Sequence, residues 1–151
     1  MFEILFLGTA AAIPSKERSM PCVALRHRSS VTMFDCGEGV QRQFMFSPFS
    51  FMKVDWIFLT HLHGDHVLGL PGLLQTMSLS GRERRLNVVG PTGTAESIRM
   101  MMDSCRGTVG YDLQVMEASP GDLFDCDGFG VTAVATDHVV DSLGYVIAGN
   151  P

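Results

Sequence analysis

The sequence predicts a mixed α/β fold, and three observations support this prediction. The chain has 151 residues, of which 46% are hydrophobic and 18% charged, so one domain or part of one can bury a sizeable core. Strand-like and helix-like segments alternate through the middle of the chain, and strand-like segments pair as hairpins toward both ends. This pattern is typical of a layered structure in which helices pack on a mixed sheet.

The first third of the chain is predicted to form three strands and a short helix. Residues 1–7 form an apolar strand that Gly8 ends. A loop with two prolines follows, and then come two strands joined as a hairpin and a helix, at 23–25, 31–35 and 40–46.

The rest of the chain alternates between the two kinds of segment and ends in strands. The predicted strands are 55–59, 86–89, 113–117, 123–124, 129–135 and 143–148, and the predicted helices are 67–79 and 94–105. Three strands, at 1–7, 55–59 and 129–135, are apolar on both sides of the alternation. Such strands belong to sheets that are covered on both faces.

The composition excludes several classes of protein. No apolar run reaches the roughly 18 residues of a membrane helix, and the first residues carry Glu3 and no preceding cation, unlike a secretory signal. The four cysteines, Cys22, Cys36, Cys105 and Cys126, form no C-x-x-C pair, which excludes a zinc ribbon. We therefore expect reduced, mostly buried thiols in a cytoplasmic protein without membrane association.

The net charge of -5 hides an asymmetry. All 11 Lys and Arg lie at or before Arg106, and seven acidic residues follow it without a base. Most of the basic residues are Arg, which suits bidentate phosphate contacts, although the overall acidity argues weakly against nucleic acid. The basic run at 81–85 fits either an RNA phosphate contact or a charged hairpin tip.

The strongest feature is a cluster of metal-ligand residue types directly after a predicted strand: His61, His63, Asp65 and His66. Residues two apart in extended backbone project the same way, so His61 and His63 can bind one ion together. Gly64 lets the chain turn, so that Asp65 and His66 can face a neighbouring ion. Imidazole and carboxylate ligands suit zinc, and two ions can bind the attacking and leaving oxygens of a displacement at phosphorus.

Three further polar residues are candidates outside this cluster. His138 follows another predicted strand and completes a three-histidine set for the first ion. Asp35 ends a strand before two nearby glycines, so it can support the ligands or cap a local turn. His27 lies between two arginines in a predicted turn, where we expect an exposed surface residue.

The segment from His61 to His66 is identified as the motif of the metallo-β-lactamase superfamily, and the words around it resemble ribonuclease Z. These words are Phe6-Leu7-Gly8-Thr9, Pro14-x-Lys16-x-Arg18, Phe34-Asp35-Cys36-Gly37-Glu38-Gly39 and Gly69-Leu70-Pro71-Gly72-Leu73-Leu74. Lactonases, sulfatases and glyoxalases share the metal motif, so the Pro-x-Lys-x-Arg loop discriminates best. That loop departs from the family at Ser19, where Asn is usual.

The resemblance implies a zinc endoribonuclease that removes the 3′ trailer from precursor tRNA and leaves a 3′-hydroxyl. It implies that His61, His63 and His138 bind the first of two zinc ions, and that Asp65 and His66 belong to the second. Asp65 is then also the catalytic general base for attack of water on phosphorus.

The resemblance assigns Lys16 and Arg18 to the loop that contacts the 3′ end of the substrate tRNA. Ordinary solvation of an exposed loop explains the same two cations. We keep both interpretations of these residues.

The resemblance further implies that residues 1–151 are the N-terminal part of a metallo-β-lactamase domain, a four-layer αββα sandwich. The family takes a bridging Asp and a last His from further along the chain. No histidine follows His138, and we do not expect Asp141 to be the bridge. One half exposes the inner face of its sheet, so we expect a homodimer or a complementing C-terminal half to cover it.

Two other functions stay open on the sequence. The chain fits another hydrolase of the superfamily, acting on a lactone, a thioester or a sulfate ester. It also fits a non-catalytic half-domain that dimerises or binds RNA without cleaving it. Metal content separates the last function from the others, and cleavage of precursor tRNA against a generic phosphodiester separates the two hydrolases.

Overall fold

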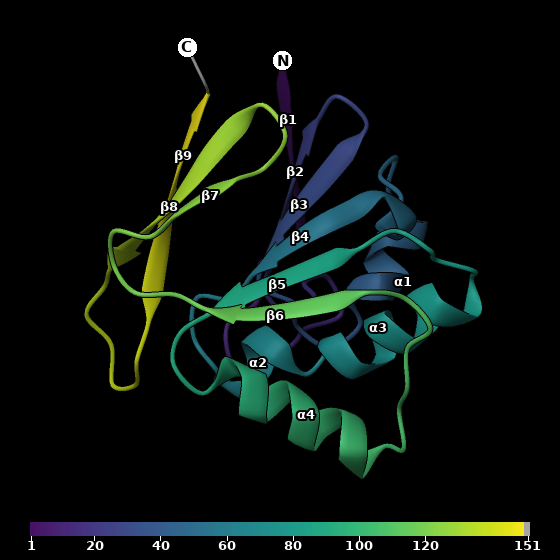
Figure 1. Cartoon of the computed structure of the whole chain (residues 1–151). Coiled ribbons are helices and arrows are strands. Elements are labelled where there is room, and N and C mark those ends of the chain that lie inside the picture. Colours follow the sequence, from purple (N-terminus) through teal and green to yellow (C-terminus); the bar gives the residue numbers. More distant parts are fainter. Residues whose placement is uncertain (150–151) are drawn as a thin grey trace.

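The computed structural model describes residues 1–149 and contains two sheets (Figure 1). The larger sheet has six strands in the order β1-β2-β3-β4-β5-β6, and the smaller has three in the order β7-β8-β9. The predicted mixed α/β class is confirmed. Residues 150–151 of the predicted domain lie outside the described part of the chain.

The elements follow one another along the chain much as predicted. The strands are β1 (Phe2–Gly8), β2 (Cys22–His27), β3 (Ser30–Phe34), β4 (Val54–Phe58), β5 (Leu86–Gly90), β6 (Leu113–Glu117), β7 (Leu123–Asp125), β8 (Phe129–Ala135) and β9 (Leu143–Gly149). The helices are α1 (Val40–Met45), α2 (Gly64–Val67), α3 (Leu70–Leu79) and α4 (Thr94–Ser104), with a 3-10 turn η1 (Phe51–Lys53) that was not predicted.

The larger sheet is antiparallel from β1 to β3 and parallel from β3 to β6. Because the four parallel strands run the same way, their carboxyl ends meet at one edge of the sheet and their amino ends at the other. Ligands of open α/β sheets bind outside the carboxyl ends. This topology therefore brings the loops after β3, β4 and β5 to one place.

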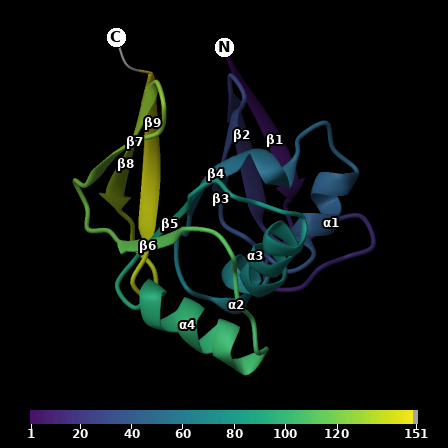
Figure 2. The ribbon, with the colours of Figure 1, turned by 45° about the vertical axis from the view of Figure 1, so that its right-hand side comes forward.

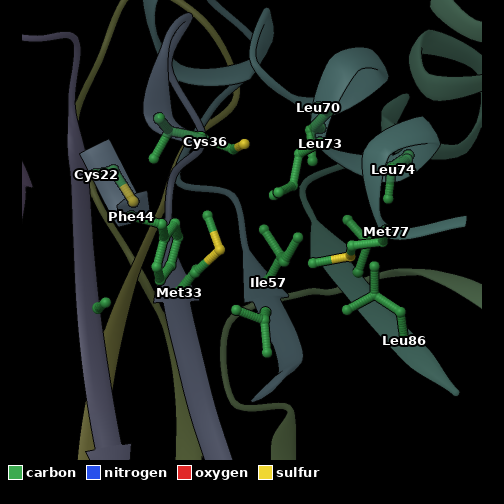
Figure 3. Close-up of a cluster of buried hydrophobic side chains, with 14 of the residues drawn as sticks. Cys22, Met33, Cys36, Phe44, Ile57, Leu70, Leu73, Leu74, Met77 and Leu86 are labelled. Atoms are coloured by element: carbon green, nitrogen blue, oxygen red, sulfur yellow. The ribbon is translucent and has the colours of Figure 1, made fainter. Parts of the chain in front are cut away.

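The helices cover one face of the larger sheet. Helix α3 buries Leu70, Leu73, Leu74 and Met77, which recur at helical spacing. Figure 3 shows strand side chains such as Met33 and Leu86 in one buried cluster with Phe44, Met77 and the leucines of α3.

The smaller sheet covers part of the other face, which corrects the expectation that this face lies open. Figure 2 shows the smaller sheet on one side of the larger sheet and the helices on the other. The smaller sheet packs against Leu25, Phe58 and Val89 of the larger sheet. Its residues in this contact are Phe129, Val131, Ala133 and Leu143. Residues two apart along β8 share a face, so β8 contributes its apolar side to this second core.

The apolar side chains that remain exposed on this face of the larger sheet belong mainly to β1. Phe2, Ile4 and Phe6 are 39%, 62% and 67% exposed. Ile4 pairs with Leu25 in the register of β1 and β2, and cross-strand partners point the same way. The exposed residues therefore face the side on which the smaller sheet lies.

The single helix predicted over 67–79 is wrong, because the structure divides it into α2 and α3. The Gly69 amide donates to the Cys36 carbonyl at 2.9 Å, and a Cβ on Gly69 would lie 2.1 Å from the Gly37 oxygen. This close approach interrupts the helix. Pro71 lies in the first turn of α3, where its missing amide costs nothing.

His27 is not the exposed turn residue that the sequence indicated. It ends β2 and is partly buried, with its ring centroid 4.7 Å from that of Phe2 and 5.6 Å from that of Phe129. The hairpin turn thus begins two residues later than predicted, after His27.

The cysteines are free and mostly buried, as the sequence predicted. All four cysteines are free, and Cys105 alone among them is exposed. Within residues 1–149, no helix has the length and apolar character needed to cross a membrane.

Candidate metal centre

The candidate ligands gather at the carboxyl edge of the parallel strands. His61, His63, Asp65 and His66 follow β4, and His138 follows β8 of the smaller sheet. Two hydrogen bonds hold the start of β9 against the segment after β4. The Leu143 amide donates to the Thr60 carbonyl at 2.8 Å, and the Tyr145 hydroxyl donates to the Leu59 carbonyl at 2.7 Å.

The structure brings the three predicted histidines together. Ligand atoms of His61, His63 and His138 all lie within 4.8 Å of one another, and His138 Nε2 is 3.4 Å from His63 Nδ1. Two nitrogens bound at ~2.0–2.1 Å to a tetrahedral ion are about 3.4 Å apart. The set therefore fits one metal ion.

Asp35 connects two of the candidate ligands. It adopts φ 61° directly after β3, and its carboxylate accepts hydrogen bonds from the Thr60 amide at 2.8 Å and from the Thr60 hydroxyl. The same carboxylate lies 2.7 Å from His66 Nδ1, and the Thr60 hydroxyl lies 2.9 Å from His61 Nδ1. Asp35 thus orients ligands as well as shaping its turn.

This network sets the proton positions on both rings. Because a carboxylate only accepts hydrogen bonds, His66 Nδ1 carries the proton that it donates to Asp35. The Thr60 hydroxyl donates to Asp35 and so accepts from His61 Nδ1. Both histidines then keep Nε2 for an ion, which is the usual arrangement behind metal-bound imidazoles. The sequence analysis did not identify Thr60 as a supporting residue. The only signal for it was its position directly before His61.

Asp65 and His66, the pair predicted for a second ion, lie beside the three histidines. The His61 and His66 ring centroids are 4.1 Å apart, and Asp65 Oδ2 lies 3.4 Å from His66 Nε2. The backbone amide of Ala12 donates to the same Asp65 oxygen at 3.0 Å. No property of the Ala12 side chain pointed to this contact, because every residue except proline has such an amide.

The surroundings change the acidity of three of these groups. Burial lowers the pKa of His61, and the neighbouring His66 lowers it further. The hydrogen bond to Asp35 raises the pKa of His66. Burial works to raise the pKa of Asp65, but hydrogen bonds from the Ala12 amide and from its own amide, together with the nearby His66 and His61, outweigh burial and lower that pKa. Asp65 is therefore ionised at neutral pH.

Lys16 and Arg18 lie on the exposed loop between β1 and β2. The Ser15 amide donates to the Arg18 carbonyl at 3.0 Å, and the Ser15 hydroxyl accepts from the Glu17 and Arg18 amides. Neither cation forms an ion pair with any residue in 1–149. They therefore remain accessible to a ligand.

The arginine run before β5 serves the fold. The buried Arg82 guanidinium donates to the carbonyls of Arg84, Arg85 and Met52. Arg84 pairs with Asp55, and Arg85 pairs with Asp112. Since the run precedes β5, it lies at the amino edge of the parallel strands, opposite the histidines. Of the two interpretations, the charged turn explains it better.

Comparison with known proteins identifies relatives of the whole chain. The model of the β-lactamase superfamily domain matches residues 32–151. Ribonuclease Z of Methanothermobacter thermautotrophicus is 43% identical over 145 residues, which cover 96% of this chain and 47% of that protein. Ribonuclease Z of Archaeoglobus fulgidus is 44% identical over 151 residues, which cover 99% of this chain and 49% of that protein.

A solved structure agrees with these sequence relatives. The crystal structure of human tRNase Z, short form, superposes with a TM-score of 0.87 at 34% identity, covering 99% of this chain and 64% of that chain. The predicted fold is thereby confirmed. The chain spans about half the length of the curated relatives that it matches.

Proposed function

Because the chain belongs to the β-lactamase superfamily and is similar to ribonuclease Z over nearly its whole length, we propose that it forms the metal-binding half of an endoribonuclease. Its substrate is precursor tRNA, from which it removes the 3′ trailer. The observation that carries the proposal is the convergence of His61, His63 and His138 within 4.8 Å. The relatives' names, ribonuclease Z and tRNase Z, support the substrate.

Zinc is the proposed metal, with two ions in the complete site. His61, His63 and His138 hold the first ion through ring nitrogens, and Asp65 with His66 contributes to the second. A donor set of imidazoles and one carboxylate is what zinc prefers. When bound, zinc supplies a lowered water pKa and stabilises negative charge on the phosphate oxygens.

The chain's own residues then act on the attacking water. Asp65 is ionised, so it can accept the proton of a water that attacks phosphorus. The bond from phosphorus to the tRNA 3′ oxygen breaks and that oxygen takes up a proton from solvent, which leaves a 3′-hydroxyl on the tRNA and the phosphate on the trailer. Asp35 and Thr60 keep His61 and His66 in orientation throughout, because their hydrogen bonds do not involve the metal-facing nitrogens.

We also propose that residues 1–151 act as the N-terminal half of a larger domain. The share of the relatives that the chain covers supports this, as do the exposed Phe2, Ile4 and Phe6 beside the smaller sheet. Either a second copy or a complementing C-terminal half covers these side chains. Native mass spectrometry of the isolated chain tests this: we expect dimers or aggregates, and a monomer with ordinary cleavage rates contradicts it.

A cytoplasmic location is the remaining part of the proposal. The four free cysteines support it, because thiols persist in reducing compartments.

Cleavage of a labelled precursor tRNA by the zinc-loaded whole protein tests the function. Asp65→Ala should lower the rate by roughly 10²–10⁴-fold while leaving the fold intact. The double variant Lys16→Ala, Arg18→Ala should slow cleavage of precursor tRNA but not of a small phosphodiester. Near-normal turnover by Asp65→Ala removes Asp65 from the mechanism, and equal losses on both substrates by the double variant remove the loop from RNA recognition.

A further inference from the structure

The loop between β1 and β2 touches the reactive carboxylate at one point, the Ala12 amide. This amide donates to Asp65 Oδ2 at 3.0 Å across 53 residues of chain. Ala12 is the centre of a three-residue turn closed by the Ile13 amide and the Ala11 carbonyl at 2.6 Å. Its φ of 58° lies in the left-handed region, which a residue with a Cβ rarely adopts, and turns of this kind are uncommon. The backbone holds an unfavourable conformation that directs the amide at Asp65.

The end of the same loop is packed tightly beneath the metal-ligand segment. Met20 is 4% exposed. A Cβ on Gly8 would lie 1.7 Å from the Met20 carbonyl oxygen, and a Cβ on Gly37 would lie 2.3 Å from the Met20 Cβ and 2.6 Å from the backbone carbonyl oxygen of Asp65. Three backbone segments thus meet without spare room, so the loop cannot move at this end without disturbing Asp65.

The tip of the loop, in contrast, is exposed and carries the two free cations. The Ala10 amide donates to the Ser19 carbonyl at 2.9 Å, which closes the stem of the loop. Lys16 and Arg18 lie beyond this closure, and Ala12 lies between the stem and the tip. A short, constrained stretch of backbone therefore joins the cations to the carboxylate.

We propose that the Ala12 backbone amide is a positioning group for Asp65, and that through it the 10–19 loop couples contact with RNA to the orientation of that carboxylate. The coupling rests on the proposed function, because it takes RNA as the ligand of Lys16 and Arg18. One Asp65 oxygen is held by the amide, and the other is left for metal and water. Without the amide, the carboxylate loses the hydrogen bond that ties it to the loop.

Replacing one backbone amide by an ester tests this directly. Ala12→L-lactic acid removes the N–H and keeps the methyl group, and Ala11→L-lactic acid is the matched control because the Ala11 amide donates no hydrogen bond within residues 1–149. Ala12→Gly is a second variant that keeps the amide and relieves the left-handed strain. Thermal unfolding of the metal-free chains checks that all three fold.

Two titrations are followed at the Asp65 Cγ resonance by NMR. In the zinc titration, we expect the midpoint to rise about tenfold for Ala12→L-lactic acid, the size typical of a lost supporting contact, and to stay within twofold for the other two variants. In the titration with precursor tRNA, the Asp65 resonance should respond in the control. It should not respond in Ala12→L-lactic acid, although the RNA binds with the same affinity.

The outcomes separate this inference from the proposed function. Equal zinc midpoints in the two esters overturn the positioning role, and an equal Asp65 response to bound RNA overturns the coupling. If precursor tRNA binds neither ester nor the unmodified chain, the proposed substrate fails and the coupling with it, while the zinc midpoints still decide whether Ala12 positions Asp65.

Discussion

The two edges of the parallel strands use polar residues in opposite ways. At the carboxyl edge, His61 and His66 spend one ring nitrogen on Thr60 and Asp35 and keep the other for a ligand. At the amino edge, Arg82 donates to three backbone carbonyls, and its neighbours each pair with an aspartate. Histidines that keep one ring nitrogen available can bind a ligand, whereas arginines that are each paired stabilise the fold.

The pKa of His61, at the carboxyl edge, supports this distinction. Burial and the nearby rings lower the pKa of His61, so the folded chain disfavours a charge that the residue carries readily in water. Sequences break local rules of this kind mainly at functional sites. Burial also lowers the pKa of Arg82 at the amino edge, but there the guanidinium donates to three carbonyls and lies beside Asp55, so no donor is left for a ligand.

The largest expected effect is on the carboxyl edge. His138→Ala should weaken zinc binding by about a hundredfold or more, since zinc bound by four ligands is worth roughly 10–16 kcal/mol. Competition with a chromogenic chelator measures it. His27→Ala is the control, because His27 lies at the far end of β2 among Phe2 and Phe129. Unchanged affinity in His138→Ala excludes it as a ligand.

The next effect is on the amino edge and concerns stability alone. Arg82→Ala should lower the free energy of unfolding by about 3 kcal/mol, because carbonyl groups buried with it lose their donors. Urea denaturation measures it, with the exposed Arg99→Ala as control. We expect zinc affinity to be unchanged, and a loss of zinc binding at equal stability would mean that the two edges are not independent.

Asp35 gives a third comparison, because carboxylates at both edges hold a basic group. Asp35→Asn should weaken zinc binding by roughly 10–100-fold, whereas Asp112→Asn, which loses only the partner of Arg85, should not. Since Asp35 raises the pKa of His66, protonation of His66 contributes a gain in stability to the metal-free protein as the pH falls through that pKa, whereas His61, whose pKa is lowered, works against it. Asp35→Asn should lose this gain, and denaturation curves at pH 5 and pH 8 would detect it.

The smallest effect is expected at Arg84. Its ion pair with Asp55 is half exposed, and pairs of that kind contribute about 0–1 kcal/mol. Arg84→Ala should therefore change the urea midpoint only slightly and leave both zinc binding and RNA cleavage as they are. A clear loss of precursor tRNA binding would return the arginine run to the RNA-binding interpretation.

Local features were the ones that the sequence predicted well. The alternation of apolar segments placed nearly every strand within a few residues, and the spacing of His61 and His63, with His138 after a second strand, predicted that these three converge. The break between α2 and α3 escaped prediction because it depends on Gly69 meeting Gly37. The apolar pattern of β8 did not reveal that this strand belongs to a second sheet, since a strand's composition does not name its neighbours.

The contacts around the candidate centre were harder to predict for a related reason. Asp35 reaches His66 because β3 and β4 are parallel neighbours, which only the folded sheet determines. Thr60 and Ala12 act through a hydroxyl and a backbone amide, groups that are common along any chain. Supporting residues of this kind carry no pattern of their own.

The distance along the chain between His63 and His138 has a mechanical consequence. The two rings meet across 75 residues, and they belong to segments from different sheets. An ion bound by both acts as a cross-link that closes this long loop. A covalent bridge across a loop of such length lowers the conformational entropy of the unfolded chain, which stabilises the fold by roughly 4 kcal/mol. Removal of the ion by a chelator should therefore unfold the β8–β9 hairpin before the helices that cover the larger sheet. The same ion would then serve both catalysis and stability.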